Sequence, residues 1–209
     1  MQLDAQSEYH HLTVGPSDAL VCASLEGASI TDSVFQGVSF GSVSGKKLHL
    51  NRVRFERCDL SNVDWAECSL TDVVFTDCRL TGMRCTEAYL VGCRATNAKL
   101  DLAQFRFSEL RDTVFTSCEL READFYHASL TRVQFVTCTL DGAEFYQATG
   151  KDWDFRSSEV GALRFGSGDL AGARISAQQL IALSPTLAAL AKLRVDDEPA
   201  TAGDAVSHS

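Results

Sequence analysis

The chain has 209 residues, of which 45% are hydrophobic and 22% charged, and these values are typical of a single globular domain. The net charge of −9 disfavours direct binding to DNA or RNA, because an acidic surface repels the phosphate backbone. No stretch approaches the roughly 18 apolar residues of a membrane helix, and the N-terminus lacks the basic and apolar regions of a secretory signal, so we expect a cytoplasmic protein with no membrane partner.

A five-residue repeat begins after the first 19 residues. From Leu20 to Leu180, 29 of the 33 residues at every fifth position are Leu, Ile, Val, Phe or Trp. The four exceptions are Gly45, Cys85, Ala95 and Gly150. A second column, two residues earlier, holds small uncharged residues such as Ala, Cys, Val, Ser and Thr. Each unit therefore points two side chains inward and three outward, which fits neither an α-helix nor a flat strand.

A backbone that turns a corner every five residues satisfies this pattern. Four units close one coil of about 20 residues, and successive coils stack at roughly 4.8 Å. We predict an all-β fold, a right-handed quadrilateral β-helix of about eight coils over residues 20–175. Every twentieth residue falls in the same column, and two columns are Leu-rich while two are Phe-rich. A slip of one unit would place Leu over Phe, so these columns should fix the register. Residues 1–19 are expected to form an irregular lead-in or cap.

The cysteines fall on inward positions of the predicted coil, with one exception. Buried free cysteine behaves as a small hydrophobe, and we predict core thiols for seven of the eight. Cys58 and Cys78 lie one coil apart, which would also suit a disulfide, but a reducing cytosol favours free thiols. Cys22 should lie outside the core. The predicted core positions are Cys58, Cys68, Cys78, Cys85, Cys93, Cys118 and Cys138.

No motif for a metal, a cofactor or catalysis is present. The sequence lacks a CxxC pair, zinc-type Cys/His spacing, a Gly-rich phosphate loop and a recognisable triad. Filled walls would leave no cleft in which to enclose a substrate. We therefore expect neither an enzyme nor a bound cofactor or metal.

The C-terminal segment has helix signals. Ser176 and Gln179 form a predicted capping box, and Ser184-Pro185 indicates the start of a second helix. An open β-helix end needs a cover, so residues 176–195 are expected to be a helical cap. Residues 196–209 lack core-forming side chains and are expected to be disordered. The apolar residues assigned to the cap are Leu180, Ile181, Leu183, Leu187, Leu190 and Leu193.

Several units resemble the A(D/N)LXX unit of the pentapeptide-repeat family. They include CDLSN (58–62), CELRE (118–122), ADFYH (123–127) and AEFYQ (143–147), and the resemblance covers residues 20–175. Members of the Qnr, mycobacterial fluoroquinolone-resistance and albicidin-resistance types are dimers that imitate duplex DNA and bind gyrase or topoisomerase IV. The resemblance implies a homodimer formed through the C-terminal segment and a topoisomerase as the protein partner.

One side of the predicted tube collects carboxylates. We call the side whose inward residues are Leu60, Leu80, Leu100, Leu120, Leu140 and Val160 the acidic side, and its net charge is about −3. Its candidate partner-binding residues are Asp59, Asp101, Glu119, Glu122, Asp141 and Glu159. By analogy with the family, this side would dock on a type II topoisomerase and modulate it or protect it from antibiotics. The alternatives are a solvated face without a role and a scaffold for unrelated protein partners. DNA carries one charge per roughly 1.7 Å, far more than this side, so mimicry would depend on where the carboxylates lie.

Overall fold

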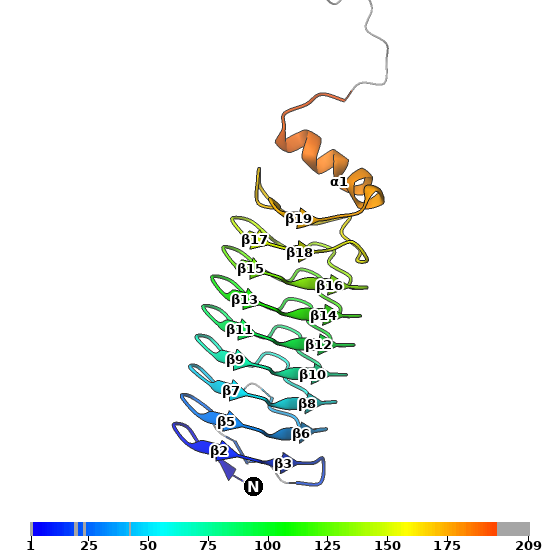
Figure 1. The fold of residues 1–209 in the computed structure, drawn as a ribbon. Coiled ribbons are helices and arrows are strands. Elements are labelled where there is room, and N and C mark those ends of the chain that lie inside the picture. The colour runs from blue at the N-terminus through cyan, green and yellow to red at the C-terminus, as the bar shows by residue number, and fades with distance from the viewer. Residues whose placement is uncertain (1, 19–20, 23, 42, 196–209) are drawn as a thin grey trace, which may run out of the picture.

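The structure is a computed structural model that describes residues 2–18, 21–22, 24–41 and 43–195. Stacked coils form a tube, and a helix covers its C-terminal end (Figure 1). The predicted quadrilateral β-solenoid of about eight coils is confirmed. The expected disordered tail, 196–209, lies outside the described residues. Within the described part of the chain, no helix has the length and apolar character that a membrane span requires.

Two sides of the tube carry parallel sheets. The eight strands of the first lie on what we call the Leu90 side: β2 (Glu8–His10), β5 (Ser29–Thr31), β7 (His49–Asn51), β9 (Ser69–Thr71), β11 (Tyr89–Val91), β13 (Glu109–Arg111), β15 (Ser129–Thr131) and β17 (Thr149–Lys151). The nine strands of the second lie on the Phe75 side: β3 (Thr13–Val14), β6 (Val34–Gln36), β8 (Arg54–Glu56), β10 (Val74–Thr76), β12 (Arg94–Thr96), β14 (Val114–Thr116), β16 (Gln134–Val136), β18 (Trp153–Asp154) and β19 (Ala173–Arg174). Two further short strands, β1 (Gln2–Leu3) and β4 (Val21–Cys22), pair with each other.

The other two sides are held by isolated bridges between residues 20 apart. On the acidic side Asp59 is bridged to Arg79, and on the remaining side, which we call the Phe125 side, Asp124 is bridged to Glu144. Many corner residues adopt a left-handed backbone, such as Glu67 with φ 58°. This conformation turns the chain without breaking the hydrogen bonds between coils.

Like residues stack on like residues along the core, as the register predicted. Six pairs of Phe rings in adjacent coils have centroids 4.8–5.3 Å apart and interplanar angles of 2–12°. Leu70, Leu90 and Leu110 face one another in register through β9, β11 and β13. A shift of one unit would break every Phe stack, so side-chain identity and strand register support each other.

Two of the four exceptions to the repeat make room for a tryptophan. A Cβ on Gly45 would lie 2.7 Å from Trp65, and one on Gly150 would lie 2.7 Å from Trp153, so each glycine makes room for an indole ring. Cys85 and Ala95 have no such partner. Both line a small internal cavity of about 20 Å³, at the level where the two Phe columns are interrupted.

Residues 2–14 form a further coil in place of the expected irregular lead-in. β2 and β3 pair with β5 and β6, and Leu3 and Val14 are buried. Val14, not Gly15, lies beneath Phe35, a spacing of 21 residues. The count of five continued toward the N-terminus misses this coil because the reading frame shifts by one residue between Val14 and Leu25.

The prediction of a second helix from Ser184 is wrong. A single helix, α1 (Ala177–Leu190), runs through Pro185. Proline has no N–H to donate to the carbonyl of Ile181, and the Ser184 hydroxyl donates to that oxygen instead, at 2.7 Å. This local hydrogen bond lets the helix continue where the Ser-Pro pair signalled a boundary.

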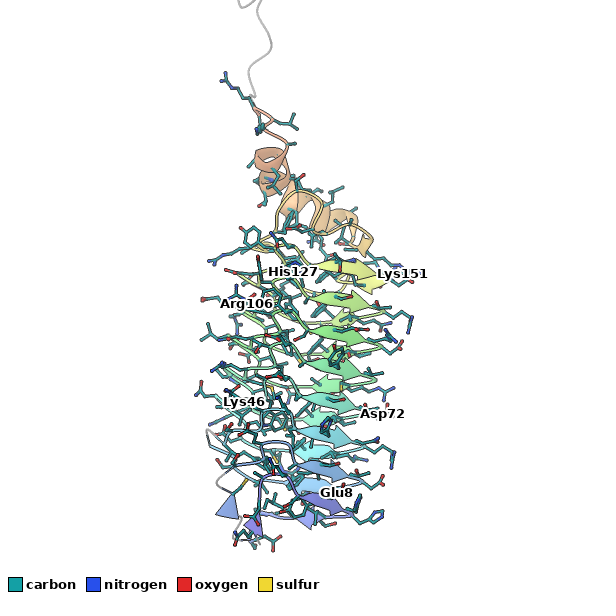
Figure 2. All side chains as sticks on the ribbon, turned by 90° about the vertical axis from the view of Figure 1, so that its left-hand side faces the viewer. Glu8, Lys46, Asp72, Arg106, His127 and Lys151 are labelled. Carbon is teal, nitrogen blue, oxygen red and sulfur yellow. The ribbon has the colours of Figure 1, made fainter. Side chains whose placement is uncertain are left out.

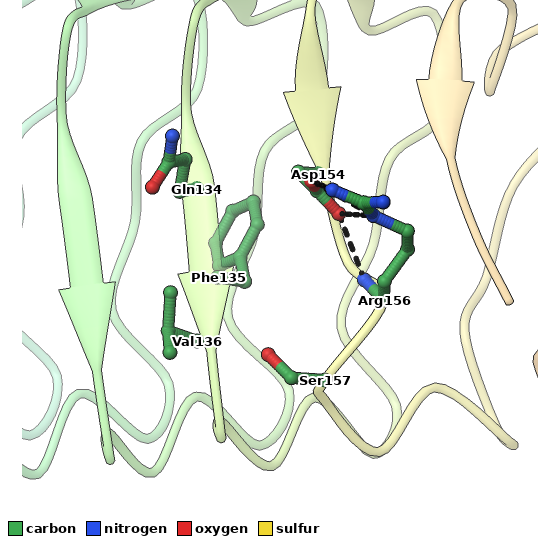
Figure 3. A pocket seen from close by; sticks show the side chains of 6 residues that line it. All are labelled: Gln134, Phe135, Val136, Asp154, Arg156 and Ser157. Atoms are coloured by element: carbon green, nitrogen blue, oxygen red, sulfur yellow. Dashed lines mark hydrogen bonds and ion pairs between the residues drawn. The ribbon is translucent and has the colours of Figure 1, made fainter.

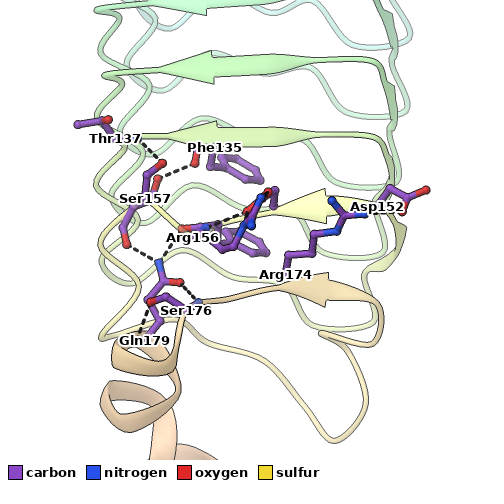
Figure 4. A network of polar contacts seen from close by, with 11 residues as sticks. Phe135, Thr137, Asp152, Arg156, Ser157, Arg174, Ser176 and Gln179 are labelled. Carbon is purple, nitrogen blue, oxygen red and sulfur yellow. Dashed lines mark hydrogen bonds and ion pairs between the residues drawn. The ribbon is translucent and has the colours of Figure 1, made fainter.

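The predicted capping box is confirmed, and Gln179 does more than cap the helix (Figure 4). Gln179 N donates to Ser176 Oγ at 3.2 Å, and Ser176 N donates to Gln179 Oε1 at 2.8 Å. Gln179 Nε2 also donates to the carbonyls of Phe155 (2.6 Å) and Ser158 (2.7 Å). One buried side chain therefore donates to the open carbonyl of Ser158 and to that of Phe155, which also accepts from Ser158 N, and so joins the helix to the tube.

Candidate partner-binding surface

The six predicted carboxylates lie on the acidic side in two columns and at one corner. Asp59, Glu119 and Glu159 share the column of bridged residues, in which Arg79 and Lys99 separate Asp59 from Glu119. The other three are Asp101, Asp141 and Glu122. Acidic and basic residues therefore alternate with one another in the first coils of this side, and the coils nearer to α1 carry mainly acidic residues.

Two of the six carboxylates are paired. Arg121 lies between Glu119 (2.9 Å) and Asp101 (3.8 Å), and Lys99 Nζ is 3.6 Å from Glu119. Asp59 accepts a hydrogen bond from Ser61 N at 3.0 Å, and hydrogen bonds from Ser61 hold the pKa of Asp59 below its usual value. Cationic side chains and hydrogen bonds within the protein therefore compensate much of the negative charge of the first coils.

The last three carboxylates form the unpaired part of the surface. Glu122, Asp141 and Glu159 are exposed, and within the described residues no ion pair involves any of them. They lie on neighbouring coils, since Glu122 N donates to the carbonyl of Asp141 at 2.9 Å and Leu140 N to that of Glu159 at 3.0 Å. We call these three residues the carboxylate cluster. Its last member, Glu159, follows Ser158, whose carbonyl accepts a hydrogen bond from Gln179 of α1, so the cluster extends toward the helix.

The residues assigned to the cap divide into two groups. Leu183 is 1% exposed and Leu190 packs partly against the core, so these two hold α1 on the tube. The others keep much of their apolar surface in solvent: Leu180, Ile181, Leu187 and Leu193. Leu193 follows the end of the helix. An apolar groove, lined partly by Leu170, Ile175 and Leu187, runs between the last coil and α1.

The sequence reasoning missed a patch of exposed and half-buried aromatic side chains. Phe107, Tyr126, His127 and Tyr146 lie on outward positions of the Phe125 side, and Tyr89 lies at the start of the neighbouring Leu90 side. Figure 2 shows Arg106 and His127 on this flank of the tube. A signal was present, since Phe107 is the one phenylalanine of twelve outside the five-residue register.

A shallow hollow near β16 and β18 contains an ion pair (Figure 3). Arg156 lies 2.7 Å from Asp154, and hydrogen bonds from Arg156 lower the pKa of that carboxyl. Phe135, beneath it, is part of the core. Each charge in this hollow is thus matched by the other.

All eight cysteines are free, and the seven predicted core thiols are buried while Cys22 is half-buried. Burial raises the pKa of Cys93 to about 12. A hydrogen bond between neighbouring thiols, together with burial, raises the pKa of Cys118. Across the described residues, no group of three or more His, Cys, Asp or Glu side chains could hold a metal ion. The thiols therefore serve as core packing.

The profile of the family described as "Pentapeptide repeat region" matches residues 28–105, 48–125 and 90–165, well over half of the chain. Curated protein sequences give no significant match. Among solved structures, a trypsin-treated variant of QnrB1, a plasmid-mediated fluoroquinolone resistance protein, is 16% identical, with a TM-score of 0.42 over 85% of this chain and 97% of that one. HetL, a protein involved in heterocyst differentiation regulation from Nostoc sp. strain PCC 7120, is 15% identical, with a TM-score of 0.37 over 84% of this chain and 83% of that one.

Proposed function

Since the chain belongs to the pentapeptide repeat family, we propose that it is a docking protein that binds a type II topoisomerase, DNA gyrase or topoisomerase IV, in place of duplex DNA. Binding would modulate the enzyme or protect it from antibiotics that target it. We infer binding in place of catalysis because side chains fill the tube and its surface hollows are shallow.

The carboxylate cluster is the observation that supports this proposal. Glu122, Asp141 and Glu159 are exposed, lie on adjacent coils and have no cationic neighbour within ion-pair distance among the described residues. Coils repeat at roughly 4.8 Å, so the three charges, one on each of three successive coils, stand at successive levels of a rigid surface. A topoisomerase surface that binds phosphates would be complementary to it.

A homodimer through the C-terminus would extend this surface. The four exposed apolar residues of the cap would be buried by a second copy, which offsets the cost of leaving them in water. Two tubes joined at this end would bring two carboxylate clusters near the centre of a doubled rod. Sedimentation velocity of the wild type and of Ile181→Asp tests this arrangement, and a monomeric wild type would exclude it.

The function is tested by a gyrase supercoiling assay with and without a quinolone. The wild type should change supercoiling or reduce drug-induced cleavage at micromolar concentration, and the triple variant Glu122→Gln, Asp141→Asn, Glu159→Gln should do so less. The matched control Glu8→Gln, Glu26→Gln, Asp72→Asn removes the same charge from exposed carboxylates of early coils that form no ion pair among the described residues, and it should act as the wild type does. No effect of the wild type, or equal activity of the two triple variants, would refute the proposal.

The exposed aromatic patch favours a second candidate, a scaffold for other protein partners. Tyr and Phe rings are typical of protein–protein contacts, whereas a DNA mimic needs none. Affinity capture with the wild type and with the carboxylate triple variant separates the candidates. Recovery of the same partners by both, without a topoisomerase, would favour the scaffold.

A further inference from the structure

Two aromatic rings stand in solvent at the corner between the Phe125 side and the Leu90 side. Phe107 is 53% exposed and Tyr89 is 59% exposed. Leaving such rings in water is unfavourable unless a partner covers them. Phe107 is nevertheless held in place, because its ring lies 5.5 Å from both Tyr126 and His127. The corner therefore offers a preformed aromatic surface.

Two carboxylates complete a hollow with these rings. Glu67, Glu87, Tyr89 and Phe107 line it. Glu67, Glu87 and Phe107 occupy the same corner position in three successive coils, with left-handed φ values of 56–58°. The corner is fixed by backbone hydrogen bonds, from Glu67 N to the carbonyl of Thr86 at 2.8 Å and from Glu87 N to that of Arg106 at 2.9 Å.

The negative charge of the hollow is poorly matched within the chain. No ion pair in the described part of the protein involves Glu87. Among the described residues Glu67 forms one ion pair, with Lys47 at 3.7 Å, and this pair is weak because both side chains are exposed. Two carboxylates and two aromatic rings line the hollow, and it suits a cation because carboxylates and ring faces both attract positive charge.

The protein already contains one arginine in such a setting. Arg106 Cζ lies 4.9 Å from the centre of the Tyr126 ring, and Arg106 Nε lies 3.3 Å from Asp124. A guanidinium on this same surface thus contacts a ring and a carboxylate that both belong to the next coil. The neighbouring hollow offers two rings and two carboxylates, and none of the described residues that line it is an arginine.

From this arrangement we propose that the hollow binds an arginine side chain of a partner protein. A planar guanidinium can stack on Phe107 or Tyr89 while its N–H groups bridge Glu67 and Glu87, which the compact ammonium of lysine cannot do in the same way. The proposal concerns a different surface from the carboxylate cluster, and it holds whichever protein that cluster binds.

The test is an NMR titration of the full chain with the peptide acetyl-Ala-Arg-Ala-amide. The same peptide with citrulline in place of arginine is the control, because citrulline keeps the shape and removes the charge. The arginine peptide should shift the ring signals of Phe107 and Tyr89, whereas the citrulline peptide should leave them unchanged. Equal shifts with both peptides, or none with arginine, would overturn the proposal.

Substitutions then locate the binding. Phe107→Gln copies Gln147, which has the same left-handed backbone at φ 57°, so the fold should be retained. This variant should bind the arginine peptide about two- to fivefold more weakly, and Glu87→Gln about twofold or more. Glu26→Gln and Tyr146→Thr remove a charge and a ring away from the hollow and should bind as the wild type does. Wild-type affinity in both Phe107→Gln and Glu87→Gln would contradict the assignment.

Discussion

Inward residues of neighbouring units compensate one another in size. Gly45 and Gly150 leave space that Trp65 and Trp153 fill. The same compensation is incomplete at Ala95, which lines the cavity of about 20 Å³. Close packing of protein interiors makes such a gap costly, even at the size of a methyl group.

A larger residue at this gap should stabilise the protein. Ala95→Val adds two methyl groups in β12, where β-branched residues suit a strand, and should raise the free energy of unfolding by roughly 0.5–1 kcal/mol. Ala128→Val adds the same volume to a filled part of the core and should lower it by roughly 1–3 kcal/mol. Urea unfolding midpoints measure both, and destabilisation by Ala95→Val equal to that by Ala128→Val would contradict this view of the core.

The sequence predicted which positions lie in the core, but it did not predict how the small residues in the column of large ones are packed. The column of large residues follows from period alone, because every unit meets the same environment. Gly45 and Ala95 are both small, yet one has a tryptophan over it and the other lines a cavity. That difference depends on contacts between coils, and the five-residue period gives no information about them.

At the scale of elements, the two ends of the tube are built differently. The N-terminal end is a coil whose frame shifts by one residue, and the C-terminal end is α1. Gln179 fixes α1 on the C-terminal end of the tube, since its amide donates to the carbonyls of Phe155 and Ser158. The capping box was predictable from spacing. The continuation through Pro185 was not, because it depends on a side-chain hydrogen bond from Ser184.

Removing the Gln179 amide should loosen the last coil. Gln179→Ala leaves the carbonyl of Ser158 without its donor, removes one of the two donors to the carbonyl of Phe155 and breaks the capping box. These losses should destabilise the protein by roughly 1–3 kcal/mol. The exposed neighbour Gln178→Ala is the control and should have little effect. Hydrogen exchange should become faster at the last coils in the first variant. Equal exchange and unfolding midpoints in the two variants would show that α1 is not joined to the tube in this way.

Whole-molecule stability should fall in acid because charged pairs link the coils. Hydrogen bonds from Arg52 and Arg132 lower the pKa of Asp32 and Asp112, respectively, in the folded state. A lowered folded pKa adds stability above the unfolded value of about 3.9, and this contribution is lost as pH falls through the folded pKa. The urea midpoint should therefore decrease below about pH 4. The double variant Arg52→Gln, Arg132→Gln should show a smaller decrease, and an unchanged pH dependence would contradict the role of these pairs.

The candidate surface of the whole molecule was predictable in part. Reading every twentieth residue assigned six carboxylates to one side, and the structure places them there. Their pairing was not predictable, because Arg121 reaches Glu119 in its own unit and Asp101 in the preceding coil. Only side-chain contacts reduce the six to the cluster of Glu122, Asp141 and Glu159.

Competition with DNA tests the central proposal most directly. A fluorescent duplex bound to purified gyrase is titrated with the protein, and the bound fraction is followed by anisotropy. We predict that the wild type displaces the duplex and that the variant Glu122→Gln, Asp141→Asn, Glu159→Gln needs about tenfold more protein, if each exposed charge contributes roughly 0.5 kcal/mol. A duplex that stays bound at micromolar wild-type protein, or displacement that is equal for the variant, would contradict the account.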